Sequence, residues 1–249
     1  MAGPAEMSFW DHLDVLRGTL FRSVLVIFAL SVVFLCAKTP LFSVVLGPSR
    51  PDFFLYRRLG LDFGMQLVNI DVSAQFFVHL KLAVLCGAVA GFPYIVWEIW
   101  KFIAPALYEN EKKAVRGAFA MSSVLFYLGV AVGYCIVLPV CLLFFMNYSV
   151  SDAIVNTISL NSYVSMFISM VFLIGIVFEF PTVAAVLSNL GIVNRPMLKA
   201  ARKYAFVVIL VLAALITPSD PVSMVVLAVP LYALYECSIL VCRNKQATE

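Results

Sequence analysis

Long runs of apolar residues, separated by short polar segments, dominate the chain. Most of these runs have about the 20 residues that an α-helix needs to cross a bilayer. Because a backbone in lipid has to satisfy its own hydrogen bonds, runs of this length predict helices. The six apolar runs cover residues 19–37, 75–97, 118–146, 163–190, 205–216 and 222–241.

Two runs depart from the ordinary spanning length. The run 118–146 is longer than a bilayer requires, and we expect it to tilt or bend near Gly129, Gly133 and Pro139. The run 205–216 is short, since its residues cover only about 18 Å of a hydrocarbon core of about 30 Å. We expect this run either to be re-entrant or to lie where the bilayer thins.

The segments outside the first runs also carry a pattern. Residues 8–17 place Phe9, Leu13 and Leu16 at helical spacing with Asp14 on another face, which predicts a separate amphipathic helix on the membrane interface. Residues 38–73 combine many prolines and glycines with aromatic residues. This composition favours a folded cap over a loose loop.

Basic residues in the connections predict the orientation. Cytoplasmic connections of membrane proteins carry an excess of Lys and Arg. Eleven basic residues fall in one set of connections and four in the other, which places the first set and both termini in the cytoplasm. The first set holds Arg17, Lys101, Lys112, Lys113, Arg116, Arg195, Lys199, Arg202, Lys203, Arg243 and Lys245, and the second holds Lys38, Arg50, Arg57 and Arg58.

Composition agrees with a membrane protein and excludes several functions. The chain is 63% hydrophobic and 12% charged, and its mean hydropathy is +1.01. The net charge of +3 is too small to indicate nucleic-acid binding. Phosphate-loop, zinc-helix and nucleophile-elbow motifs are missing, and the six cysteines lack ligand spacing. We therefore expect one all-α transmembrane domain over 1–249, no enzyme activity, no cofactor and no metal.

Glu179 is the most informative ionisable residue inside an apolar run. A carboxylate at this depth costs roughly 2.5–3.5 kcal/mol to insert, and Pro181 beside it predicts a kink with an unpaired carbonyl. The acid serves either as a structural hydrogen-bonding group or in transport. A proton-coupled secondary transporter with Glu179 as coupling acid is an alternative function, although the inverted repeats of such transporters are not visible. An intramembrane protease lacks a convincing nucleophile and base.

The connection between the second and third runs has an unusual surface. An apolar block, Phe102-Ile103-Ala104-Pro105-Ala106-Leu107-Tyr108, leads into the acidic residues Glu109 and Glu111. Apolar blocks are uncommon on a solvated loop, so this one indicates a binding surface for an apolar segment that carries cationic groups.

The same block resembles the hallmark cytoplasmic loop of the TatC family. Similar motifs follow along the whole chain in the family order, on a six-helix pattern. They are His12-Leu13, Leu16-Arg17, Pro48, Pro93, Leu125-Phe126-Tyr127-Leu128-Gly129, Phe178-Glu179-Phe180-Pro181, Thr217-Pro218 with Asp220, and Pro230-Leu231-Tyr232 with Glu236.

The resemblance implies a function, a fold and partners. It implies the receptor subunit of the twin-arginine translocase, which binds signal peptides with consecutive arginines and exports folded proteins using the proton-motive force. The fold would be a concave bundle of six transmembrane helices in the bacterial cytoplasmic (inner) membrane. Its partners would be small single-span TatA/TatB-type subunits, signal peptides and further copies of the chain in the active complex.

The resemblance also implies site residues. Glu111 matches the receptor carboxylate of the family, and arginine forks onto a carboxylate through two hydrogen bonds. The family has Glu where this chain has Val15, so Asp14 or Glu109 would have to supply a second acid. The implied signal-peptide site is Asp14, Arg17, Phe102, Pro105, Leu107, Tyr108, Glu109 and Glu111, the intramembrane polar or partner contacts are Glu179, Thr217 and Asp220, and the structural prolines are Pro48, Pro93 and Pro181.

Overall fold

The computed structural model describes residues 9–61, 63–104, 109–151, 156–217 and 221–242. The side chains of residues 9–12, 109–111, 113 and 114 also lie outside this description.

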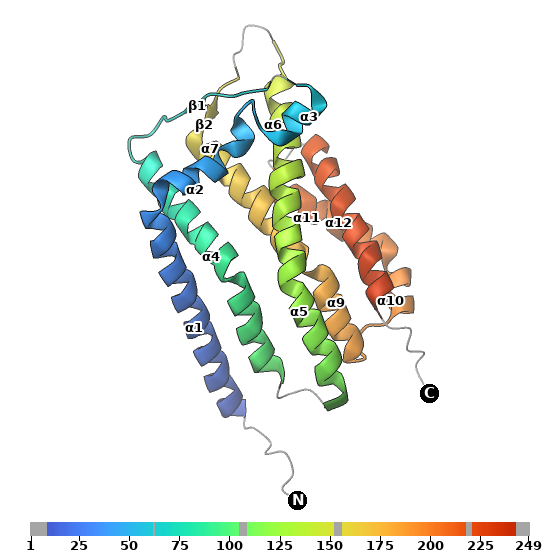
Figure 1. Cartoon of the computed structure of the whole chain (residues 1–249). Helices are drawn as coiled ribbons and strands as arrows, with labels where there is room; N and C mark the ends of the chain where they lie inside the picture. The colour runs from blue at the N-terminus through green and yellow to red at the C-terminus, as the bar shows by residue number, and fades with distance from the viewer. Residues whose placement is uncertain (1–8, 62, 105–108, 152–155, 218–220, 243–249) are drawn as a thin grey trace, which may run out of the picture.

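Helices make up nearly all of the described chain, and they run side by side as a bundle with a small cap at one end (Figure 1). This arrangement confirms the expected all-α class. The helices of the bundle are α1 (Phe9–Cys36), α4 (Ala74–Ile103), α5 (Glu109–Val132), η3 (Gly133–Val137), α6 (Leu138–Asn147), α7 (Leu160–Phe167), η4 (Ile168–Leu173), α8 (Ile174–Val177), α9 (Phe180–Asn189), α10 (Arg195–Ala200), α11 (Arg202–Ile216) and α12 (Pro221–Val241).

Five helical stretches of the described chain are long and apolar enough to cross a membrane. A further helix, α11, has 15 residues, which corresponds to about 22 Å at the helical rise. The five long stretches are Leu13–Cys36, Ala74–Ile103, Val115–Asn147, Leu160–Asn189 and Pro221–Val241.

Helix α1 differs from the expectation at the N-terminus. The structure has one continuous helix, Phe9–Cys36, where the sequence predicts a separate amphipathic helix over 8–17 and a span over 19–37. Gly18, the residue between them, lowers helix propensity by only about 1 kcal/mol relative to Ala and does not end a helix. Hydropathy marks where a helix enters lipid, whereas the helix itself continues through polar residues.

The bends lie where glycine and proline allow them. The third span changes to a π-helical segment, η3, at Gly133, two residues before the carbonyl that Pro139 leaves unpaired at Cys135. A second π-helical segment, η4, packs against η3. A Cβ atom on Gly133 would lie 2.5 Å from the Met170 carbonyl oxygen, so this crossing requires glycine.

Helices α1 and α4 make the most extensive contact between two elements of the described bundle. A Cβ atom on Gly87 of α4 would lie 2.8 Å from the Ser31 backbone nitrogen and 2.9 Å from the Ile27 carbonyl oxygen of α1. Large apolar side chains elsewhere on α1, including Phe21 and Phe28, are exposed. Since α1 packs mainly on α4, its outer face is left for lipid or a partner.

A folded cap closes the end of the bundle opposite to the start of α1 (Figure 1). Buried tyrosine hydroxyls hold it, because Tyr56 donates to the Pro48 carbonyl oxygen over 2.7 Å and Tyr163 donates to the Val45 carbonyl oxygen over 2.7 Å. The cap also contains a short parallel strand pair that sequence analysis does not predict. Its elements are α2 (Lys38–Val45), η1 (Gly47–Ser49), α3 (Phe54–Leu59), β1 (Leu67–Val68) and its partner β2 (Ile158–Ser159).

Candidate functional site

The end of the bundle where α1 begins also holds the end of α4 and the start of α5 (Figure 1). We call it the inner end. Asp14 and Arg17 are exposed there, and Phe102 is half-buried at the end of α4. Glu109 and Glu111 are the first and third residues of α5. Their side chains, together with residues Pro105, Leu107 and Tyr108, lie outside the described part of the chain.

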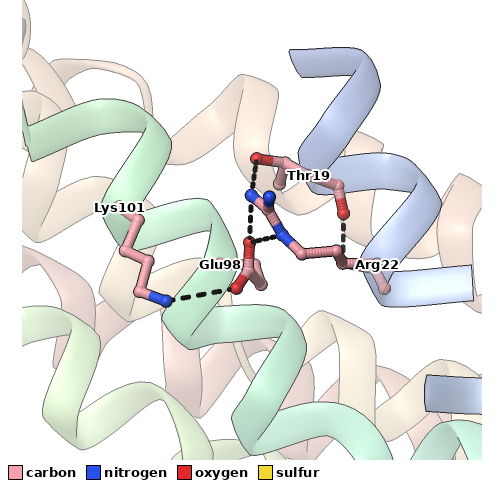
Figure 2. Close-up of polar contacts among 5 residues, drawn as sticks. Thr19, Arg22, Glu98 and Lys101 are labelled. Atoms are coloured by element: carbon pink, nitrogen blue, oxygen red, sulfur yellow. Dashed lines mark hydrogen bonds and ion pairs between the residues drawn. The ribbon is translucent and has the colours of Figure 1, made fainter. Parts of the chain in front are cut away.

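A buried carboxylate joins α1 to α4 at this end, and Figure 2 shows it between two cations. The side chain of Glu98 on α4 is 1% exposed, and its Oε2 atom lies 2.8 Å from Nη2 of Arg22 on α1. Arg22 also donates from Nε to the same oxygen over 2.9 Å. The other oxygen, Oε1, accepts from Nζ of Lys101 over 3.3 Å.

This cluster is an interhelical ion pair that holds α1 against α4. A carboxylate removed from water is stable only when cations and hydrogen bonds compensate it, and both oxygens of Glu98 have such partners. The side chains of Arg22 and Lys101 remain 53% and 52% exposed, so the cluster presents net positive charge to its surroundings.

Sequence analysis misses this cluster. Arg22 lies inside the first apolar run and Glu98 lies between Trp97 and Ile99, and charged residues in such positions need a compensating partner. This need for a partner is the sequence signal from which an ion pair could have been predicted. The partner itself is 76 residues away, and spacing alone does not reveal it.

Glu179 lies in the break between α8 and α9, as the adjacent proline predicts. Its Oε2 atom accepts a hydrogen bond of 2.6 Å from the buried hydroxyl of Ser122 on α5. Its Oε1 atom is buried without a hydrogen-bond partner among the described residues. Pro181 is buried in the first turn of α9. Through Ser122, the acid therefore ties the break between α8 and α9 to α5.

Thr217 contacts a different part of the bundle. Its buried hydroxyl donates to the Ala213 carbonyl oxygen over 2.9 Å at the end of α11. The residue also lines a cavity of about 490 Å³ together with Ser162 and Ser165 of α7. The structure therefore does not bring Thr217 to Glu179, and Asp220 lies outside the described residues.

The other two predicted prolines, Pro48 and Pro93, lie in different parts of the molecule. Pro48 is buried in the cap, where its carbonyl oxygen accepts from Tyr56. Pro93 is exposed inside α4 and borders a small cavity between α4 and α5. Within the described residues, no group of three His, Cys, Asp or Glu side chains could hold a metal ion.

Comparisons with known proteins agree on one family. The family model of the Sec-independent protein translocase protein (TatC) matches residues 11–230. The chain is 34% identical to the Sec-independent protein translocase protein TatC of Blattabacterium sp. subsp. Periplaneta americana, over 95% of each chain. It is 33% identical to the protein of the same name from Deinococcus radiodurans, over 96% of this chain and 87% of the relative.

A solved structure shares the fold as well. The crystal structure of the twin arginine translocase receptor TatC in DDM superposes with a TM-score of 0.79 at 30% identity, covering 93% of this chain and 99% of that chain. Family model, relatives and fold therefore coincide over almost the whole sequence, and the chain belongs to the TatC family of Sec-independent protein translocase proteins.

Proposed function

We propose that this translocase protein is the subunit that receives twin-arginine signal peptides. The carrying observation is the agreement of the family match over residues 11–230 with the apolar-acidic block between α4 and α5. On this proposal Glu111 takes one arginine of the peptide. Phe102, Pro105, Leu107 and Tyr108 form the apolar surface beside it.

Glu111 has a favourable setting for this role. It belongs to the first turn of α5, where the helix dipole favours a carboxylate in its ionised form. A partly desolvated arginine–carboxylate contact contributes about 1.5–3 kcal/mol, compared with about 0–1 kcal/mol for an exposed pair. Glu111 should therefore provide most of the selectivity for arginine.

Asp14 is our candidate for the second acid. It is exposed on α1 at the inner end, one residue from Val15, where the family has Glu. Arg17 lies one helical turn further on, and its cation would orient the two acids without itself contacting an arginine. Glu109 is the competing candidate because it also lies in the first turn of α5.

The wider proposal concerns topology and assembly. We place the inner end and both termini in the cytoplasm of a bacterium, with α11 as a sixth and short crossing of the inner membrane. The small TatA/TatB-type subunits would bind in the membrane, where Glu179, Thr217 and Asp220 offer polar contacts. The protein would bind and organise partners in a complex of several copies, with no bond-breaking activity of its own.

The direct test compares a twin-arginine signal peptide with its twin-lysine version on the purified protein in detergent. We expect capture of the first and much weaker capture of the second, because lysine lacks the planar fork. Glu111→Ala should abolish this preference, and Asp14→Ala should weaken it less. Asp71→Ala, which removes an exposed carboxylate outside the inner end, is the control and should bind normally. Equal capture of both peptides would refute the receptor role.

A further inference from the structure

A second feature of the inner end lies between α4 and α5. A cavity of about 260 Å³ opens there, with Trp97 and Trp100 from α4 and Arg116 and Phe119 from α5 among its lining residues. The centres of the Trp100 and Phe119 rings lie 5.4 Å apart at an angle of 52°, which gives the cavity an aromatic wall. Ser123 of α5 is also among the lining residues.

The charge of this cavity is positive. Arg116 is exposed, and Nζ of Lys101 lies 5.5 Å from the centre of the Trp97 ring. Among the residues that the structure describes, those that line the cavity include no Asp or Glu. Since Lys101 also contacts Glu98, Arg116 is the main charge available to an anionic ligand.

The depth of the cavity matches the boundary between water and lipid. The apolar span of α5 begins at Val115, so Arg116 lies at its first turn. Trp97 and Trp100 lie in the last two turns of the opposing span, α4. Tryptophan and basic residues gather at this level of a membrane, where the phosphates of the lipid headgroups also lie.

We propose that this cavity binds an anionic phospholipid of the cytoplasmic leaflet. The Arg116 guanidinium would hold the phosphate by two hydrogen bonds, while Trp97, Trp100 and Phe119 contact the glycerol and the start of an acyl chain. The choice of leaflet rests on the orientation in the proposed function. A free phosphate would leave the aromatic wall unused, and Arg116 would repel an arginine-rich peptide.

The test uses fluorescence from the cavity itself. The chain has three tryptophans, so Trp10→Phe leaves only Trp97 and Trp100 to report. The full-length protein in detergent is titrated with phosphatidylglycerol or phosphatidylcholine brominated near the top of the acyl chains. We expect phosphatidylglycerol to quench at a concentration about fivefold lower, the effect of one basic residue at a membrane surface.

Variants assign the effect to Arg116. Arg116→Ala and Arg116→Gln should both remove the preference for phosphatidylglycerol, whereas Arg116→Lys should keep most of it. Lys199→Ala, which removes a cation of α10 outside the cavity, should leave it intact. Thermal unfolding identifies which of the two neutral variants is folded and can be used.

Several results would overturn the proposal. Equal quenching by the two lipids, or an unchanged preference in both neutral variants, would exclude an anionic lipid site. Displacement of the lipid by millimolar inorganic phosphate would assign a free-anion site, and displacement by a twin-arginine peptide would assign the cavity to the signal peptide. Peptide capture by the Arg116 variants is measured separately, so failure of the lipid site is distinguishable from failure of the receptor role.

Discussion

Two carboxylates within the apolar helices illustrate different ways of tolerating an acid in a membrane protein. Glu98 is compensated by the cations of Arg22 and Lys101. Glu179 has one hydroxyl partner, Ser122, and one acceptor without a partner among the described residues. Both oxygens of Glu98 have partners, which indicates a structural role in joining α1 to α4. The set of partners of Glu179 is incomplete among the described residues, and we propose that Glu179 gains a further polar partner during transport.

Removing Arg22 and removing Glu98 should have unequal effects on the free energy of unfolding. Arg22→Ala leaves a buried carboxylate with Lys101 as its cation and a hydrogen bond from Tyr94, so we expect a loss of about 1–3 kcal/mol in the free energy of unfolding. Glu98→Ala leaves two cations that are already half exposed, and we expect a loss below about 1 kcal/mol. Thermal unfolding in detergent measures both, and the Arg22→Ala/Glu98→Ala double variant should be more stable than Arg22→Ala alone. Equal losses in the single variants would contradict the compensation described here.

Glu179 should tolerate loss of its charge and not loss of its hydrogen bond. Glu179→Gln keeps an acceptor for Ser122, whereas Glu179→Ala leaves that buried hydroxyl unpaired. We expect the Gln variant to export most of a folded reporter protein and the Ala variant to lose much of this export, with signal-peptide capture normal in both. Ser122→Ala is the matched control for the hydrogen bond. A Gln variant as inactive as Ala, yet normally inserted, would favour proton coupling at Glu179.

At the scale of elements, glycines set how closely the helices approach. Gly87 lets α1 lie directly against α4, and Gly133 lets η3 lie against η4. The sequence predicts where the third span bends, because glycine and proline positions are local signals. It does not predict which helix each glycine faces, since that depends on residues far along the chain.

Gly87→Ala should separate α1 from α4. The added methyl group would lie 2.8 Å from a backbone atom of Ser31, which a side-chain rotation cannot relieve. We expect a loss of about 1–3 kcal/mol in the free energy of unfolding. Gly117→Ala in α5 is the control, because nothing lies within 4 Å of its new Cβ atom, and it should be neutral or gain up to about 1 kcal/mol. Thermal unfolding that ranks the two variants in reverse order would exclude this packing.

The cap should depend on a neutral tyrosine. Burial raises the pKa of Tyr56 above its ordinary value near 10. An unfolded Tyr56 therefore ionises first as pH rises, so its contribution to stability is present below about pH 10 and is lost above it. Tyr56→Phe also loses the hydrogen bond to the Pro48 carbonyl, which we expect to cost about 1–2 kcal/mol. Unfolding measured from pH 8 to 11 should fall less steeply in the variant, and equal slopes would contradict this role.

At the scale of the whole molecule, the apolar runs predict the membrane class and all five long helices. They do not predict the continuous α1, because hydropathy changes near Gly18 whereas the helical backbone continues through it. They also miss the contact between Arg22 and Glu98 and the pairing of β1 with β2, since both join residues that are far apart in the chain. Local patterns specify elements, whereas the site depends on how the elements meet.

The number of crossings is tested at the turn between α11 and α12. In a variant without the six native cysteines, Ser219→Cys should react with a membrane-impermeant maleimide only from outside the cell. Lys199→Cys, before α11, should react only from the cytoplasmic side in inverted vesicles. Labelling of both positions from the same side would show that α11 does not cross, and would remove one crossing from the proposed topology.

The strand pair in the cap has a consequence for biogenesis. Leu67 pairs with Ile158, and the Tyr163 hydroxyl donates to the Val45 carbonyl, so the segment between α1 and α4 is completed by residues made 91 and 118 positions later. Helices α1 and α4 can meet as soon as both have left the ribosome, because their contacts through Gly87 need no later residue. We therefore expect a stage of synthesis in which this helical hairpin is inserted while residues 38–73 still wait for the fourth apolar segment. In the proposed topology, this segment is open to proteases and chaperones outside the membrane during that interval.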